Sequence, residues 1–293
     1  MEDEVLNKKK MKEINLFLDK NLHWISNIEL FEKLKIIGAH NCEILYIHSS
    51  LSFGMPNNTL KKEELLDELF NILLKLNVKT LCMPTFTFSF CNEKEYCPTT
   101  SKSKMGTLNE FFRVQKNVIR SIDPLMSVAL YGEDKDIVTG IGKESIGINS
   151  TFDKLRHRDR VKFLFLGTKI GDCFTYMHYL EWLYKVDYRY DKTFKGTIQN
   201  GDKVYEDKFS LFVRYKEVKP NLGSYRYEQM MYEKGIAKTI NIGDSSISIV
   251  AEKDAANAYK DCLDIDPYYF VTFNDQILEK DKTFVLENEM IAL

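Results

Sequence analysis

The sequence predicts one α/β domain with a mixed, largely antiparallel central sheet flanked by helices, preceded by a helical N-terminal arm. Short apolar runs of strand length, such as residues 43–47 and 161–166, alternate with longer segments whose apolar residues recur at helical spacing. The dipeptide Asn200-Gly201 is a strong hairpin signal and adds antiparallel pairing. Because no internal repeat or linker-like stretch divides the chain, these elements are expected to share one core.

The composition is typical of a globular protein of the cytoplasm. Hydrophobic residues make up 44% and charged residues 29% of the 293 positions, and the formal net charge is −2. No signal peptide or long apolar run is present, so neither a membrane nor nucleic acid is an expected partner. The six cysteines form no C-x-x-C pair and are expected to be reduced thiols. Cys91 and Cys97 fit no common zinc spacing, so no metal is expected.

The chain is expected to divide into an arm at residues 1–40, the main α/β domain at 41–275 and a tail at 276–293. The first 22 residues are rich in charge, which indicates a frayed or helical arm. The helix of this arm is expected to begin at Asn27, a favourable N-cap residue, and to end at Gly38.

The apolar run at 43–47 predicts a buried strand and leads into a turn of small residues. The turn begins His48-Ser49-Ser50-Leu51, and Asn57-Asn58-Thr59 precede a helix expected at 60–76. A strand end, a turn and a helix start together present free backbone N–H groups, and the helix dipole adds positive potential. The pattern therefore predicts a site for an anion such as a phosphate.

Further elements follow from the same reasoning. Strands are expected at 79–84, 117–119, 127–131 and 161–166, and an antiparallel strand at 204–215. Two strands that pair with each other are expected within 240–250, on either side of the Gly243-Asp244 turn. Helices are expected at 108–114 with Thr107 as its cap, at 174–182, at 225–234 and at 251–263. The segment 86–106 is a long loop, and loops longer than about 15 residues are often functional.

The helix at 174–182 carries the strongest chemical signal. Thr175, His178 and Glu181 are spaced three apart, so they share one helical face. A neutral imidazole accepts a proton near neutral pH, and a nearby carboxylate raises its basicity and fixes its orientation. These residues suit a general base, although a half-buried helix whose His and Glu merely pair has the same pattern.

Several short motifs accompany this helix in a definite order. They are Ile47-His48-Ser49-Ser50-Leu51, Met83-Pro84-Thr85-Phe86-Thr87, Met105-Gly106, Arg120-Ser121-Ile122-Asp123-Pro124, residues 149–155, Phe165-Leu166-Gly167-Thr168 and Thr175-x-x-His178-x-x-Glu181. In this order and at these spacings the chain resembles the antibiotic N-acetyltransferase family, whose best-known members are the aminoglycoside 3-N-acetyltransferases. The resemblance implies transfer of an acyl group from coenzyme A to an amine.

The resemblance also implies roles for individual residues. His178 would be the general base, Glu181 would orient it or bind the substrate amine, and Thr175 would donate to the oxyanion or the sulfur. Acetyl-CoA or another acyl-CoA would be held at the turn and nearby loops, by His48, Ser49, Ser50, Leu51, Asn57, Asn58, Thr59, Thr85 and Arg120.

Two positions depart from the family pattern. Asn57-Asn58 stands where relatives usually carry paired glycines, and Asp123 stands where they usually carry histidine. Asn tolerates left-handed backbone conformations better than most residues, so the turn is expected to survive. His48 is either a second catalytic imidazole or, as we favour, a buried, hydrogen-bonded structural residue. Arg120 either binds an anion or pins its loop through a salt bridge.

The acceptor is less well determined by the sequence. Aminoglycosides are polycations, yet the long loop carries Lys94, Lys102 and Lys104 against Glu93 and Glu95. This balance favours an amino sugar with an anionic group, such as a nucleotide-linked amino sugar of surface polysaccharide, over an aminoglycoside. The expected partners are this acceptor and acyl-CoA, and a homodimer is left open.

Two other function classes remain alternatives. A non-catalytic coenzyme-binding protein would keep the turn and need no base. A thioester hydrolase would use Ser49 or a cysteine with His178, but the G-x-S-x-G nucleophile motif is absent from the sequence.

Overall fold

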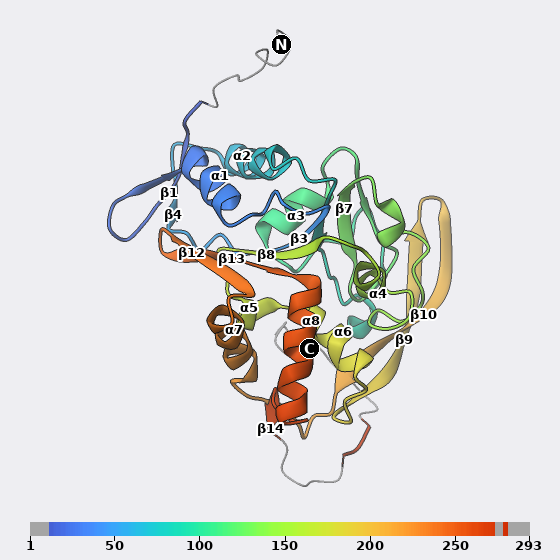
Figure 1. The fold of residues 1–293 in the computed structure, drawn as a ribbon. Helices are drawn as coiled ribbons and strands as arrows, with labels where there is room; N and C mark the ends of the chain where they lie inside the picture. The colour runs from blue at the N-terminus through green and yellow to red at the C-terminus, as the bar shows by residue number, and fades with distance from the viewer. Residues whose placement is uncertain (1–11, 273–277, 281–293) are drawn as a thin grey trace, which may run out of the picture.

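The computed structural model describes residues 12–272 and 278–280 and is built on a seven-stranded sheet of order β12-β13-β8-β3-β5-β7-β6 (Figure 1). The strands are β3 (Ile44–Ser49), β5 (Thr80–Pro84), β6 (Val118–Arg120), β7 (Val128–Gly132), β8 (Val161–Leu166), β12 (Ala237–Ile242) and β13 (Ser245–Ala251). β3 is parallel to β5 and β8, and the other four pairings are antiparallel. The predicted mixed, largely antiparallel sheet is therefore confirmed.

Helices cover both faces of the sheet, as Figure 1 shows. One face carries α1 (Asn27–Ile36), α2 (Lys62–Lys75) and α3 (Thr107–Arg113). The other carries α4 (Thr151–Arg156), α5 (Ile170–Cys173), α6 (Tyr176–Leu183), α7 (Gly223–Glu233) and α8 (Glu252–Ile265). Because successive strand residues point to opposite faces, Leu45 and Ile47 pack under α1 to α3 while Ile44 and Tyr46 pack under α4 to α8.

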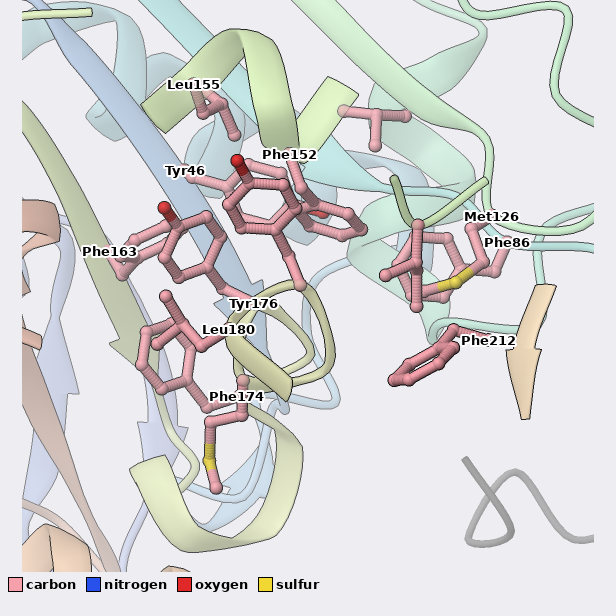
Figure 2. Close-up of a cluster of buried hydrophobic side chains, with 14 of the residues drawn as sticks. Tyr46, Phe86, Met126, Phe152, Leu155, Phe163, Phe174, Tyr176, Leu180 and Phe212 are labelled. Atoms are coloured by element: carbon pink, nitrogen blue, oxygen red, sulfur yellow. The ribbon is translucent and has the colours of Figure 1, made fainter. Parts of the chain in front are cut away.

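The core on the second face is rich in aromatic side chains and fixes the position of α6. Tyr176 packs against Phe163 of β8, with ring centroids 4.7 Å apart, and Phe163 packs against Tyr46 of β3 at 5.6 Å. Figure 2 shows these three rings together with Phe174 and Leu180 from the segment around α6. The apolar residues of this segment thus fix the helix face that carries His178 and Glu181 beside the sheet.

The parallel strands β3, β5 and β8 end at the same edge of the sheet. Because β3 and β5 are joined through the crossover helix α2, their carboxyl ends meet there with that of β8. Ser50, Thr85 and Gly167 follow these strand ends. Ligands of open α/β sheets bind in such a place.

The N-terminal arm differs from the helical prediction. β1 (Asn15–Leu18), β2 (Trp24–Ser26) and β4 (Met55–Pro56) form a small sheet of order β2-β1-β4 ahead of α1. Leu16 and Phe17 are fully buried, so packing on the core overrides the charged local sequence.

Two predicted helix caps are wrong by one residue. Ser26, not Asn27, caps α1 by accepting a hydrogen bond from the backbone N–H of Glu29 at 3.2 Å. The side chain of Asn27 instead accepts from the N–H of Ile14. Gly106 is the cap residue of α3, and the predicted cap Thr107 is its first helical residue. These shifts leave the helices themselves in place.

A long two-stranded ribbon forms a sheet separate from the central one. β9 (Arg189–Asn200) and β10 (Lys203–Arg214) pair along twelve residues each, and Gly201 forms the turn that the Asn-Gly signal predicts. The ribbon is tied to the body by Tyr96, whose N–H donates to Thr197. β11 (Lys219–Pro220) and β14 (Val271–Thr272) form a further short pair.

Some predictions concern the chain as a whole. No helix in the described residues is long and apolar enough to cross a membrane. All six cysteines lie in the described residues and are free thiols. The predicted tail, 276–293, lies outside the described residues except for 278–280, and residues 1–11 of the arm lie outside them too.

Candidate active site

α6 brings the predicted base and carboxylate into direct contact. The Nδ1 atom of His178 lies 2.7 Å from Oε2 of Glu181, one helical turn away. The side chain of Glu181 is 5% exposed and that of His178 is 18% exposed. The carboxylate is therefore inside the protein, while the imidazole reaches its surface.

Arg189, the first residue of β9, completes a buried ion pair with Glu181. Its Nε lies 2.8 Å from Oε2 of Glu181, its Nη2 lies 2.9 Å from Nδ1 of His178, and its Nη1 donates to the carbonyl of Phe212. The hydroxyl of Tyr188 donates to Oε1 of Glu181 at 3.0 Å. Neither Arg189 nor Tyr188 was predicted to be a site residue, although a carboxylate on a half-buried face requires a counter-charge.

The charges in this cluster set the protonation states. Burial alone would raise the pKa of Glu181, but Arg189 and His178 outweigh it and hold that pKa at about 2. Burial and then Arg189 lower the pKa of His178 by more than Glu181 raises it. At neutral pH the site therefore holds an ionised carboxylate and a neutral imidazole.

The neutral imidazole has one ring proton, and two groups compete for Nδ1. Arg189 can only donate there, whereas the ionised Glu181 can only accept. We assign the proton to Nδ1 because the carboxylate contact is the shorter of the two. Nε2 then carries the lone pair, and no hydrogen bond to it is formed by any residue in the described part of the chain. This is the arrangement that a general base requires.

Thr175 and His48, which both lie near Phe174, make different contacts. The hydroxyl of Thr175 donates to the carbonyl of Cys173 at 3.2 Å, just before α6. His48 is 3% exposed, stacks on Phe165 with ring centroids 5.1 Å apart, and meets the edge of Phe174.

Burial lowers the pKa of His48 to about 3, so its imidazole is neutral. Its Nε2 is buried and has no hydrogen-bond partner among the described residues. His48 is thus buried, as we favoured, but Nε2 lacks the hydrogen bond expected of it. Its predicted role toward the coenzyme stays a prediction.

The small residues after β3 pack closely against the end of β8. The N–H of Ser50 donates to the carbonyl of Leu166 at 2.9 Å, and a Cβ at Gly167 would lie 2.1 Å from the carbonyl oxygen of Ser50. Gly167 has φ +73°, so both backbone conformation and space call for glycine. Ser49 donates from its hydroxyl to Asn109 at 2.6 Å, and Leu51 is half-buried.

The predicted direct passage from this turn into a helix is wrong. β4 intervenes and pairs with β1, so α2 begins only at Lys62. The side chain of Asn57 donates to the carbonyl of Asn15 and accepts from the N–H of Thr59, which places Asn57, Asn58 and Thr59 beside the N-terminal sheet. Neither Asn57 nor Asn58 has a positive φ, so asparagine replaces the glycines of relatives at these positions without backbone strain. Contact of these residues with coenzyme A stays a prediction.

Arg120 and Thr85 form a network that fixes the long loop. Arg120 donates to the carbonyls of Thr85, Pro98 and Ser101 and to the hydroxyl of Thr85. Hydrogen bonds to carbonyls, rather than the predicted salt bridge, therefore pin the loop. Asp123 accepts from the N–H groups of Leu125 and Met126, so it stabilises a turn. The coenzyme-binding roles of Arg120 and Thr85 stay predictions.

A cavity of about 460 Å³ lies between α2 and α3 beside the turn after β3. It is lined by Lys62, Leu66, Ser103, Lys104, Gly106, Thr107, Glu110, Phe111 and Val114. A Cβ at Gly106 would lie 3.8 Å from the carbonyl oxygen of Ser49, so this side of the cavity lies close to the turn. Lys62 and Lys104 give the cavity two cations. Within the described residues no cluster of His, Cys, Asp and Glu side chains is arranged to hold a metal ion.

Solved structures with the same fold include aminoglycoside acetyltransferases and the YokD protein. AAC-IIIb in binary complex with CoASH is 16% identical with a TM-score of 0.68, over 82% of this chain and 96% of that one. A variant of AAC(3)-IVa in complex with a gentamicin is 19% identical with a TM-score of 0.67, over 89% and 93%. YokD from Bacillus subtilis is 20% identical with a TM-score of 0.65, over 80% and 97%.

Sequence comparison identifies the family directly. No curated protein sequence matches the chain significantly. The model of the aminoglycoside 3-N-acetyltransferase family, however, matches residues 47–264, well over half of the chain, and confirms the resemblance seen in the motifs. The chain therefore belongs to the aminoglycoside 3-N-acetyltransferase family and is an enzyme of the acetyltransferase class.

Proposed function

We propose that this protein transfers an acetyl or other short acyl group from acyl-CoA to the amine of an amino sugar, with His178 as general base. The observation that carries the proposal is the neutral imidazole whose Nδ1 is held by ionised Glu181 while Nε2 stays open. General-base catalysis of this kind contributes about 10²- to 10⁴-fold in rate.

His178 would act as the amine nitrogen attacks the thioester carbonyl. A C–N bond forms while Nε2 takes the proton of the amine, and Glu181 stabilises the imidazolium that results. When the tetrahedral intermediate collapses, the C–S bond breaks and the coenzyme leaves as a thiolate, which the proton held by His178 neutralises. Arg189 would act as a positioning residue that holds Glu181. Thr175 would donate a hydrogen bond to the oxyanion or the sulfur.

The coenzyme would lie at the turn of Ser49, Ser50 and Leu51 and extend into the adjoining cavity. Lys62 and Lys104 line that cavity and would meet its phosphates. The binary complex of AAC-IIIb with CoASH supports a coenzyme site in this fold.

Two acceptor classes follow from different observations. Family membership and the gentamicin complex of a relative favour an aminoglycoside. The charges beside the base favour an acceptor with an anionic group, such as a nucleotide-linked amino sugar, because Arg189 and Arg214 both lie next to His178. A polycation would be repelled there.

The deciding experiment is a coenzyme-release screen with acetyl-CoA. Kanamycin and gentamicin are compared with nucleotide-linked 3- and 4-amino sugars, each with a control that lacks amine. Amine-dependent release supports transfer, and the amine that is used most efficiently identifies the class. Release without any amine would favour a thioester hydrolase instead.

A further inference from the structure

Arg214 ends β10 directly opposite Arg189 in the ribbon. Opposed residues of antiparallel strands place their side chains on the same face, with Cβ atoms about 4.5–5.5 Å apart. Two guanidinium groups therefore point to the same face of the ribbon, beside His178. Like charges in this position repel each other.

Only one of these two arginines has its charge balanced. Arg189 is 1% exposed and paired with Glu181. Arg214 is half-buried, and its side chain forms no ion pair or hydrogen bond with any residue in the ranges 12–272 and 278–280. Burial and the neighbouring Arg189 lower the pKa of Arg214 to about 10, so it stays charged at neutral pH in surroundings that oppose its charge.

The charged and titratable groups around Arg214 are those of the site itself. Arg189, Glu181 and Tyr188 act on its charge, and Arg214 in turn lowers the pKa of His178. Asp191 lies on the same face of β9, but opposite Phe212 and without an ion pair to Arg214. A half-buried cation without a partner beside a base is suited to bind an anion.

We propose that Arg214 binds a phosphate or carboxylate group of the acceptor whose amine His178 deprotonates. This rests on the proposed acyltransferase function and names its substrate class, an amino sugar with an acidic substituent. α6 and the ribbon pack on one face of the sheet, whereas Lys62 and Lys104 lie with α2 and α3 toward the other. The anion at Arg214 is thus assigned to the acceptor and not to the coenzyme.

The test compares acceptors with and without an anionic group. Glucosamine 6-phosphate is paired with glucosamine, and a nucleoside-diphosphate-linked 4-amino sugar with the free amino sugar. The wild type is expected to prefer the anionic member of each pair in kcat/KM. Arg214→Gln is expected to reduce that preference by about 10- to 100-fold, and Arg214→Lys by less, because charge-assisted hydrogen bonds are the strong ones.

Lys208→Gln serves as the matched control, because Lys208 is an exposed cation on the same strand and face. It should leave the preference unchanged. If Arg214→Gln lowers kcat/KM equally for charged and neutral acceptors, the proposal is overturned. A raised KM for acetyl-CoA that is relieved with 3′-dephospho-CoA would assign Arg214 to the coenzyme and also overturn it.

The proposed function itself would fail if the wild type transferred an acyl group to no amine. A second measurement tests the anion site at Arg214 in that case too. Inorganic phosphate is titrated while the pKa of His178 is followed by nitrogen-15 NMR. An anion on Arg214 removes a charge that lowers this pKa, so the pKa should rise in the wild type and stay constant in Arg214→Gln. A constant pKa in both proteins overturns the anion site.

Discussion

Nδ1 of His178 lies 2.7 Å from Oε2 of Glu181, and both groups come from one helix. The contact is fixed from outside that helix, because Arg189 of β9 reaches both side chains. The base therefore depends on how the ribbon docks beside α6. Substitutions in either element are expected to alter the dependence of kcat/KM on pH.

Replacement of Glu181 by Gln should slow transfer and move its pH dependence. The loss is expected to be about 10- to 100-fold in kcat/KM, less than the about 10²- to 10⁴-fold that the general base itself contributes. Glu181 raises the pKa of His178, so without the carboxylate this pKa falls. Since the protonated base is inactive, the acid limb of the profile should shift to lower pH. An unaltered profile at constant acceptor would assign Glu181 to structure alone.

Arg189→Gln should move the same limb in the opposite direction. The guanidinium lowers the pKa of His178, so its removal lets that pKa rise. The acid limb of the profile should therefore shift to higher pH. The measurement is again kcat/KM against pH with the same acceptor. A shift of the same sign in both variants would contradict the proposed electrostatic coupling.

Arg189→Gln should also destabilise the fold. It leaves Glu181, which is 5% exposed, without its counter-charge, and such losses amount to about 3–5 kcal/mol. Arg189→Lys retains the charge and should lose less. Urea unfolding of the three proteins measures the difference. Equal stability of wild type and Arg189→Gln would show that the ion pair is not structurally important.

Coenzyme binding should depend on the turn after β3 and the neighbouring lysines. Ser50→Trp and Lys104→Glu are expected to weaken the affinity for coenzyme A by about tenfold or more, through steric exclusion and charge reversal. Lys75→Gln at the far end of α2 is the control, since Lys75 is exposed and does not line the cavity. Calorimetry that gives one affinity for all four proteins would place the coenzyme elsewhere.

Much of the fold was predictable because its signals are local. The buried runs of β3 and β8, the apolar stripe of α2 and the Asn-Gly turn at Gly201 all appear in consecutive residues. Helical spacing predicted that His178 and Glu181 share one face, and the structure adds that they are in contact. Strand β4 was missed because its pairing with β1 brings together residues far apart in sequence.

The environment of the base was less predictable. Arg189 approaches Glu181 from the next element, and no helical or strand period links the two. Arg214 lies further along the chain and joins the site only through cross-strand pairing with Arg189. The register of a ribbon depends on its turn and on the core beneath it, so a single sequence seldom shows which charges it brings together.

The most direct test of the central claim is the activity of His178→Ala with acetyl-CoA and the best acceptor from the screen. The expected result is a fall in kcat/KM of about 10²- to 10⁴-fold. The affinity for coenzyme A should stay within about twofold, because His178 does not line the cavity proposed to hold the coenzyme. Near-normal turnover by a folded His178→Ala protein would contradict the account.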